Sequence, residues 1–300
     1  MSVLIGLPVG GGLSEFEEAV RSVFAQTNSD WQLLIVCDGS PPEIVAKAEA
    51  IRDPRVRVIV DSKNRGLAER LNQISRAADT DYVMRMDADD LMHPDRVAVQ
   101  MAFLSANPNV DVLGSGSYLV SESLVISGDY REPALPDDPS GYIQSGVFLH
   151  PTVVYKRSWA VEHPYDPQWI RTEDKELWLR TAASSQFAKI EDRLLFYRVP
   201  VELSILKQAN TSAYDRRLVR TVGPLVAARR AVAQYIIRSY VKQFMFRVLV
   251  AIGKSHVVHA SKKLPLSAGQ LSSGREALHI ALTAEVPGWP SGKLPNVGVK

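Results

Sequence analysis

Residues 82–90 read Tyr-Val-Met-Arg-Met-Asp-Ala-Asp-Asp, a largely apolar run that ends in three carboxylates. Shorter apolar runs, rich in β-branched residues, come earlier, at 3–7, 31–37 and 56–60. Segments with apolar residues at helical spacing separate these runs, at 14–26, 41–51 and 67–78. Such runs are typical of strands buried on both faces, and strands that alternate with helices form parallel sheets. The sequence therefore predicts an α/β fold with a mostly parallel central sheet flanked by helices.

The residues that directly follow the apolar runs are candidate site residues, because ligands of open parallel sheets lie beyond the carboxyl ends of the strands. These residues are Pro8, Asp38 and Asp87. The carboxylates of Asp87 and Asp89 could converge on one hard cation such as Mg²⁺ or Mn²⁺, which would neutralise diphosphate oxygens. The alternative is an acidic turn that caps the next helix, and Asp90 suits that structural role.

Other polar residues give weaker signals. Asp38 could accept a hydrogen bond from a nucleobase, although an ordinary strand-to-helix turn is the simpler interpretation. Glu173 and Asp174 open an apolar helical segment, where carboxylates serve catalysis or complement the helix dipole. His150 lies in an apolar run, where a histidine is usually a core residue, and Arg198 could simply pair with an acid. None of these residues identifies a function by itself.

Taken in order, these segments resemble the inverting family 2 glycosyltransferases, which have a GT-A type fold, and the resemblance covers about residues 1–205. It rests on a series of short motifs: Leu7-Pro8-Val9, Gln26-Thr27, Asp38-Gly39-Ser40, Asn64-Arg65-Gly66-Leu67-Ala68 with Leu71-Asn72, Asp87-Ala88-Asp89-Asp90, His150-Pro151-Thr152, Glu173-Asp174 with Leu177-Trp178-Leu179-Arg180, and Tyr197-Arg198. The resemblance implies transfer of a sugar from a nucleotide diphosphate to an acceptor hydroxyl. It also suggests synthesis of a polysaccharide or glycolipid, with a carbohydrate or lipid-linked acceptor.

The resemblance implies a donor site at the carboxyl ends of the strands. Pro8 and Asp38 are implied to line the base and ribose pocket, with Asn64 as a further nucleotide contact. Asp87 is implied to contact the ribose side, and Asp89 to hold Mn²⁺ or Mg²⁺. This assignment agrees with the chemistry, since a cation must stabilise the leaving diphosphate.

The implied reaction also needs a base. Asp174 is implied to take the proton of the acceptor hydroxyl while the nucleotide diphosphate leaves from the opposite face. One displacement of this kind inverts the anomeric centre. Glu173, His150 and Arg198 are candidates for contacts with the acceptor or with phosphate.

Two departures from the family pattern keep other functions open. Cys37 stands where relatives often have a second aspartate, and Pro200 where many have a histidine. A noncatalytic nucleotide-sugar-binding protein is therefore one alternative. A haloacid-dehalogenase-like phosphatase is a less favoured one, because its Asp-x-Asp motif usually lies on an early strand with Thr or Val at the fifth position. That position is Leu91 in this chain.

Charge divides the chain into two parts. Residues 1–215 carry 21 Lys and Arg against 31 Asp and Glu, a net charge of −10, whereas residues 216–300 carry 14 against 2, a net charge of +12. The sequence therefore predicts a catalytic domain over 1–215 and a basic helical extension with a flexible tail over 216–300.

The basic extension could bind an anionic membrane surface. Cationic and polar residues recur every fourth position, at Arg230, Gln234, Arg238 and Lys242, while apolar residues lie mostly on another face, at Val232, Ile236, Phe246 and Val250. Helices of this type rest on anionic lipid. The alternatives are packing on the catalytic domain or self-association through 216–263.

Cysteine content and hydropathy indicate the compartment. The single cysteine cannot form an internal disulfide, and no run approaches the roughly 18 apolar residues of a membrane-spanning helix. We therefore expect a cytoplasmic protein, with the inner face of the membrane as its site if the basic extension binds lipid. We expect no nucleic-acid partner.

Overall fold

The computed structural model describes residues 2–130, 134–144, 147–199, 205–251 and 263–290. Its strands are β1 (Val3–Val9), β2 (Trp31–Asp38), β3 (Val56–Asp61), β4 (Tyr82–Arg85), β5 (Leu91–Met92), β6 (Val112–Val120), β7 (Ile126–Tyr130), β8 (Val154–Lys156), β9 (Phe187–Arg198) and β10 (Lys263–Leu264). Its helices are α1 (Leu13–Phe24), α2 (Pro42–Glu49), α3 (Leu67–Ala77), α4 (Arg96–Ala106), α5 (Arg157–Glu162), α6 (Glu173–Thr181), α7 (Ile205–Thr221), α8 (Gly223–Val226), α9 (Arg229–Ala251) and α11 (Ala268–Thr283), with 3-10 turns η1 (Pro139–Ile143) and η2 (His150–Thr152).

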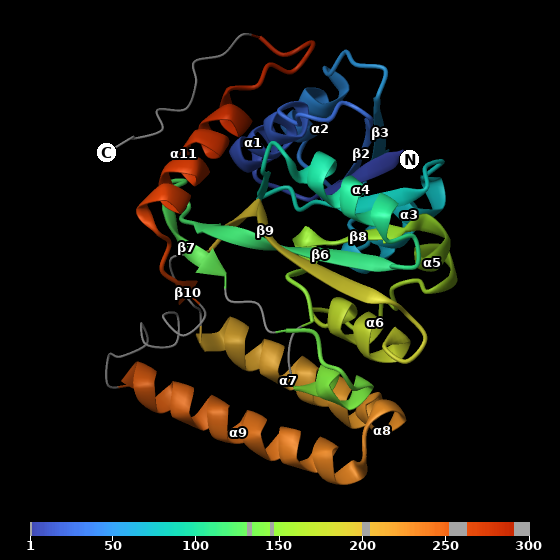
Figure 1. Cartoon of the computed structure of the whole chain (residues 1–300), viewed down its shortest axis with the longest axis vertical. Coiled ribbons are helices and arrows are strands. Elements are labelled where there is room, and N and C mark those ends of the chain that lie inside the picture. The colour runs from blue at the N-terminus through green and yellow to red at the C-terminus, as the bar shows by residue number, and fades with distance from the viewer. Residues whose placement is uncertain (1, 131–133, 145–146, 200–204, 252–262, 291–300) are drawn as a thin grey trace.

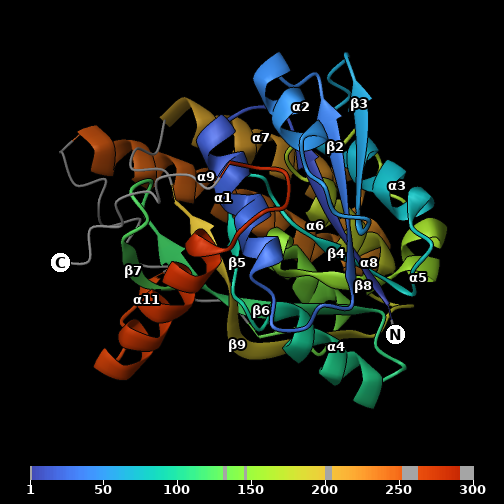
Figure 2. The ribbon, with the colours of Figure 1, turned by 90° about the horizontal axis from the view of Figure 1, so that it is seen from above.

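The strands form one sheet in the order β10-β7-β6-β8-β4-β1-β2-β3, and β9 pairs with β6 and β5. The strands β3, β2, β1 and β4 are parallel neighbours. Beyond β4 the sheet is mixed, because β8 runs antiparallel to both β4 and β6 while β9 runs parallel to β6. Helices cover both faces of the sheet (Figures 1 and 2). The predicted α/β class with a parallel central sheet is confirmed.

Two apolar cores lie on opposite faces of this sheet. Successive side chains of a strand point to opposite faces. Leu33 and Ile35 of β2 therefore enter the core under α1 and α2, whereas Leu34 and Val36 enter the core with α3 and α6. Buried strands of this kind explain why the first half of the chain reads as uninterrupted apolar runs. Because β1, β2 and β4 are parallel, the residues that follow them lie at one edge of the sheet.

The helices α7, α8 and α9 form a layer beside α6 and η1, at the bottom of Figure 1. Leu218, Val219 and Val222 of this layer are buried in the core that also contains Trp178. The predicted domain boundary after Asp215 falls within α7. The division into a catalytic domain and an extension stays a prediction. Of the described helices, none combines the length and the apolar character needed to cross a membrane.

The predicted flexible tail is wrong for Ala268–Thr283, which forms α11. A capping box starts this helix: Ser267 Oγ accepts from the backbone N–H of Gln270 at 3.2 Å, and Gln270 Oε1 accepts from that of Ser267 at 2.9 Å. Leu278 and Leu282 then pack in a third apolar cluster with β5 and β9. The Gly- and Ser-rich composition hides the helix, because tertiary contacts outweigh weak propensity. Residues 252–262 and 291–300 lie outside the described residues.

The segment after α11 returns to the N-terminal half of the chain. Val286 and Trp289 are buried in the core under α1 and α2. The indole Nε1 of Trp289 donates to the carbonyl of Lys47 at 2.9 Å, and the Lys47 ammonium lies 4.5 Å from the ring centroid. The first core is therefore built from residues nearly 290 positions apart.

Candidate active site

A cavity of about 700 Å³ lies beyond the carboxyl end of β4. Segments far apart in the sequence meet there: the turn after β4, η2, the N-terminus of α6, the end of β9, and the helices α7 and α9. Four predicted site residues line the cavity, namely Asp87, His150, Glu173 and Asp174. The fold thus brings the two carboxylate motifs of the sequence to one place.

The turn after β4 gathers three carboxylates. One oxygen from each of Asp87, Asp89 and Asp90 lies within 4.8 Å of the others. Asp90 is buried, and its Oδ1 accepts from the backbone N–H of Arg198 at 2.8 Å. Its Oδ2 has no hydrogen-bond partner among the described residues. The structural role predicted for Asp90 therefore uses only one of its two oxygens.

These carboxylates fit a divalent cation. Asp89 is exposed at the surface, but partial desolvation, with the charge of Asp87, raises its pKa. Burial, with the charges of Asp87 and Asp89, raises the pKa of Asp90 well above its ordinary value. Like charges that lie close together oppose ionisation, and a cation removes this opposition. Hard carboxylate oxygens are the ligands that Mg²⁺ and Mn²⁺ prefer. The turn could therefore hold either metal.

Arg85 is a site residue that sequence reasoning missed. Its side chain is buried, lines the cavity and donates from Nη2 to Asp87 Oδ1 at 2.8 Å. Its Nε and Nη1 have no partner among the described residues. Burial opposes its charge, but the neighbouring carboxylates Asp87, Asp90 and Asp174 leave its pKa raised. An arginine inside an otherwise apolar strand, just before three carboxylates, was the available signal.

Glu173 and Asp174 begin α6 beside the cavity. Asp174 Oδ1 accepts from the backbone N–H of Lys175 at 2.7 Å. Burial nevertheless raises the pKa of Asp174, and burial together with the charge of Asp174 raises that of Glu173. A raised pKa makes a carboxylate a stronger base, so the site suits proton transfer. The role of Asp174 as the base stays a prediction.

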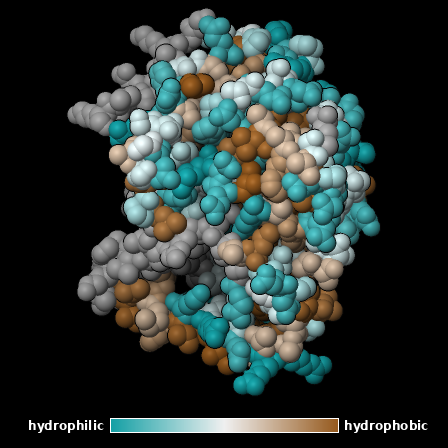
Figure 3. All heavy atoms as spheres, viewed as in Figure 1, coloured by the Kyte–Doolittle hydropathy of each residue, from teal (hydrophilic) through white to brown (hydrophobic). Residues whose placement is uncertain are grey.

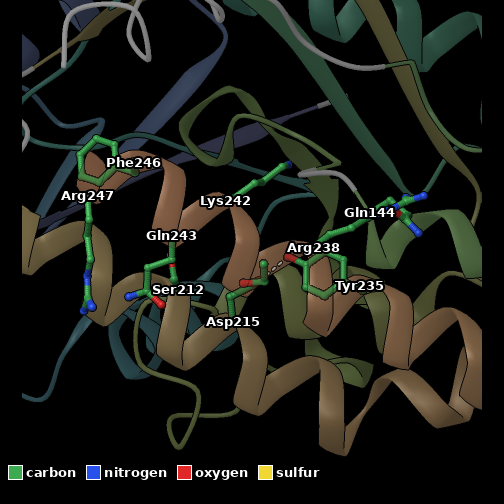
Figure 4. A pocket seen from close by; sticks show the side chains of 10 residues that line it. Gln144, Ser212, Asp215, Tyr235, Arg238, Lys242, Gln243, Phe246 and Arg247 are labelled. Carbon is green, nitrogen blue, oxygen red and sulfur yellow. Dashed lines mark hydrogen bonds between the residues drawn. The ribbon is translucent and has the colours of Figure 1, made fainter. Parts of the chain in front are cut away.

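A polar network anchors the residue next to Asp174. Lys175 Nζ lies 2.5 Å from Asp215 Oδ1 of α7 and donates to the Tyr235 hydroxyl of α9 at 3.1 Å. Tyr235 in turn donates to the other oxygen of Asp215, as Figure 4 shows. The network joins the start of α6 to both C-terminal helices. No local pattern could reveal it, because its members lie 40 and 60 residues from Lys175.

His150 is both a core residue and part of the cavity wall. Its Nε2 lies 2.9 Å from the Tyr165 hydroxyl, and its ring packs edge-on against Trp178. Burial, with the charge of Arg85, holds its pKa well below the ordinary value. The imidazole is therefore neutral and suits a hydrogen bond better than charge pairing. Its predicted contact with acceptor or phosphate stays a prediction.

Asp38 organises the loop before α3. Its oxygens accept from the backbone N–H groups of Arg65 at 2.7 Å and Gly66 at 3.0 Å, and from Nε of the buried Arg70 at 2.6 Å. This is the strand-to-helix role that the sequence left open. Asp38 does not line the large cavity. Its predicted contact with the nucleotide stays a prediction.

A second cavity, of about 520 Å³, adjoins the first and is partly lined by Asn64. The two cavities share Leu67, Arg171 and Glu173. Arg171 adopts a φ of 67°, a conformation uncommon outside glycine and often found at functional sites. Pro8 is half-buried near the end of β1 and lines neither cavity.

The loop that carries Asn64 requires glycine opposite it. Gly39 has a φ of 66°, and a Cβ there would lie 2.9 Å from the Asn64 nitrogen. This explains the Asp-Gly sequence after β2: the aspartate holds the loop, and the glycine lets it approach. The predicted role of Asn64 as a nucleotide contact stays a prediction.

Arg198 clamps the acidic turn from outside the cavity. Its guanidinium donates from Nε to the carbonyl of Asp89 at 2.8 Å and from Nη1 to that of Glu122 at 2.8 Å, and it pairs with Glu18. All three nitrogens thus have protein partners. The predicted contact of Arg198 with acceptor or phosphate stays a prediction, and Pro200 lies outside the described residues.

Comparison with known proteins relates this site to a family. The family model described as Glycosyl transferase family 2 matches residues 8–155. An uncharacterized glycosyltransferase of Methanocaldococcus jannaschii is 27% identical over 190 residues, which cover 61% of this chain and 66% of that protein. Residues 8–155 belong to glycosyltransferase family 2. The bifunctional glycosyltransferase pgtA of Dictyostelium discoideum is 25% identical over 207 residues, and the match covers 57% of this family 2 chain and 27% of pgtA.

Solved structures share the fold of the family 2 chain. The mannosyltransferase PcManGT of Pyrobaculum calidifontis, in complex with GDP-Man and Mn²⁺, aligns over 93% of this chain and 85% of that one, with a TM-score of 0.58 at 16% identity. TarS 1-349 of S. aureus, in complex with UDP-GlcNAc, aligns over 82% of this chain and 73% of that one, with a TM-score of 0.58 at 15% identity. The predicted GT-A type fold is confirmed.

Proposed function

We propose that this family 2 protein transfers a sugar from a nucleotide diphosphate to an acceptor hydroxyl, with inversion at the anomeric carbon. One observation carries the proposal: Asp87 of the acidic turn and the half-buried carboxylate Asp174 line the same cavity. Transfer needs positive charge for the leaving diphosphate and a base for the attacking hydroxyl. The cavity offers residues suited to both requirements.

The acidic turn would serve the leaving group. Asp89, with Asp87 and Asp90, would hold Mn²⁺ or Mg²⁺, and the bound cation would neutralise the diphosphate oxygens. Arg85 fixes the carboxylate of Asp87 and adds its own positive charge to the wall of the cavity. Arg198 fixes the turn itself through the Asp89 carbonyl.

The first residues of α6 would meet the second requirement, removal of the proton from the acceptor hydroxyl. Asp174 would take the proton of the acceptor hydroxyl, since burial raises its pKa and hence its basicity. Lys175 and its partners Asp215 and Tyr235 would hold the start of the helix in place. Glu173 and His150 would contact the acceptor from the same wall.

A nucleotide-sugar donor is supported by the solved relatives, since PcManGT is in complex with GDP-Man and TarS with UDP-GlcNAc. We place the base and ribose at the carboxyl ends of β1 and β2, near Pro8, Asp38 and Asn64. The acceptor is a carbohydrate or a lipid-linked carbohydrate, which assigns the protein to polysaccharide or glycolipid synthesis in the cytoplasm or at the inner face of the membrane.

The test is turnover with a panel of UDP-, GDP- and dTDP-sugars, with Mn²⁺, with Mg²⁺ and with EDTA. We expect one nucleotide class to stabilise the protein against heat, and its sugar to be transferred or slowly hydrolysed only when a cation is present. Nuclear magnetic resonance of the product gives the anomeric configuration. Donor binding without turnover across a broad acceptor panel would instead support the noncatalytic alternative.

A further inference from the structure

The helix α9 has an exposed apolar stripe, formed by Ile237, Tyr240, Val241, Phe244, Met245 and Val248. The exposed fractions of these side chains run from 42% for Val248 to 66% for Phe244. Their spacing of three and four residues places them on one side of the helix. In Figure 3 hydrophobic residues appear along the lower edge of the molecule, where α9 lies in Figure 1.

Exposed cationic side chains lie beside the apolar stripe. They are Arg238, Lys242 and Arg247, and with Gln243 they line a cavity of about 210 Å³ between α9 and α7, as Figure 4 shows. A helix on the surface of a soluble protein normally places its apolar side inward and its polar side in water. In this half of α9 a second apolar side, the stripe, faces outward although Phe246 packs inward.

The apolar face expected from the sequence is a different one. Val232 and Phe246 are buried with exposed fractions of 7% and 6%, so they pack inward. Ile236 is half-buried, and nothing is described of the Val250 side chain. Because Val232 and Phe246 face the protein, α9 can bind a membrane only through its outer side, which is the apolar stripe.

The surroundings of the apolar stripe are cationic. No acidic residue occurs in the sequence from Arg216 to Arg275. Within the described residues, the cations of α9 at Arg238, Lys242 and Arg247 form no ion pair with a carboxylate. Asp215 lines the same cavity but is engaged by Lys175 and Tyr235. The partner of this surface must therefore offer apolar contact and negative charge together.

We propose that the apolar stripe of α9 inserts into the interface of an anionic lipid bilayer, with α9 parallel to the surface and its cations among the head groups. A second copy of the chain fits less well, because a symmetric contact would bring two cationic helices face to face. An anionic bilayer supplies both acyl chains and negative head groups. The occupant follows from charge complementarity.

Docking in this way also bears on the acceptor, an extension that rests on the proposed transfer. The cavity under α9 and the large cavity share Gln144, Ser212, Asp215 and Tyr235. A bilayer on the outer side of α9 would therefore be separated by one helix from the residues that connect the two cavities. An acceptor anchored in that bilayer would be held close to the large cavity.

The test is flotation of the full-length protein with vesicles of phosphatidylcholine alone, or of phosphatidylcholine mixed with phosphatidylglycerol. We expect recovery with the anionic vesicles at low salt, and loss of recovery at high salt. Phe244→Glu should lower the partition coefficient by at least about tenfold, since it removes an aromatic insertion. Arg247→Gln should lower it roughly fivefold, as expected for one cation near an anionic surface.

Val161→Glu is the matched control, because Val161 is 46% exposed on the distant helix α5 and should leave recovery unchanged. Equal recovery with neutral and anionic vesicles, or normal recovery of Phe244→Glu, overturns the proposal. So does a concentration-dependent dimer in solution that Phe244→Glu dissolves, because the stripe would then bind a second copy. Donor hydrolysis measured in solution separates membrane binding from sugar transfer. Phe244→Glu should keep this hydrolysis. Its absence in the wild type would contradict the proposed sugar transfer but not membrane binding.

Discussion

The carboxylate of Asp174 lies in the first turn of α6, where a helix dipole lowers a carboxyl pKa, and yet burial raises its pKa. The raised pKa is informative, because a carboxylate that only complemented the helix dipole would be more stable ionised and exposed to water. Asp38 shows the opposite arrangement, with its oxygens engaged by the chain itself. The contacts of the two carboxylates thus differ: Asp174 is a candidate base, whereas Asp38 organises a loop.

Asp174→Asn tests the base. Asparagine keeps the size of the side chain but cannot take the acceptor proton, so kcat should drop by roughly 10²- to 10⁴-fold while calorimetric donor affinity survives. In the wild type, kcat should fall as pH drops through the raised pKa of Asp174, because only the ionised form accepts a proton. Near-normal turnover of Asp174→Asn, with loss of turnover in Glu173→Gln, would reassign the base to Glu173.

Asp89→Ala tests the metal site. The substitution removes one of three clustered carboxylates, so donor affinity in Mn²⁺ should weaken together with kcat. Donor affinity measured in EDTA should change little, since the lost contact acts through the cation. Unchanged affinity for Mn²⁺ and donor in Asp89→Ala would remove this residue from the metal site.

Asp38→Ala tests the loop organiser. We expect the donor KM to rise more than kcat falls, and the free energy of unfolding to fall by roughly 2–3 kcal/mol, because the buried Arg70 loses one of the two carboxylates with which it pairs and keeps Asp61. Asp61→Ala is the matched control, since it removes the other carboxylate of Arg70. If both variants raise the donor KM equally, Asp38 acts through Arg70 and does not contact the nucleotide.

At the scale of elements, α6 depends on helices that follow it in sequence. Lys175 is held by Asp215 of α7 and Tyr235 of α9, so these two helices fix the start of α6. Tyr235→Phe removes the hydroxyl from this network. We expect the free energy of unfolding to fall by about 1 kcal/mol and kcat to fall with it. Urea unfolding and initial rates measure both.

Tyr240→Phe provides the comparison for Tyr235→Phe. Tyr240 lies on the same helix but is 50% exposed, and its hydroxyl accepts from Arg220 of α7 at 3.1 Å. We expect its stability to stay within about 0.5 kcal/mol of the wild type, with full activity. Equal effects of the two substitutions would mean that the network does not position α6.

The sequence predicts an element well where the pattern of its own residues is sufficient. The parallel strands β1, β2 and β4 are buried on both faces, so each is recognised as an apolar run. In contrast, β6 and β8 depend on antiparallel partners, and α11 depends on contacts with β5 and β9. The same limit applies to the site: motifs predict Asp87 and Asp174, whereas Arg85 and the Lys175 network become visible only when distant segments meet.

At the scale of the whole molecule, the two charged parts of the chain are interleaved. The cores include residues from both sides of Asp215, since Leu218 packs with Trp178 and Trp289 packs with Phe16. The acidic part nevertheless supplies the predicted catalytic carboxylates, and the basic part supplies the surface of α9. Charge thus distinguishes two roles, chemistry and attachment, within a shared set of cores.

The return of Trp289 to the first core bears on how the protein is made. Trp289, which packs against Phe16 and contacts the Lys47 ammonium, follows Lys47 by 242 positions. Translation therefore delivers β1, α1 and β2 long before this indole, and in that interval the first core has an apolar gap where the indole belongs. Because exposed apolar surface favours aggregation, we expect the nascent chain to depend on chaperones during this interval.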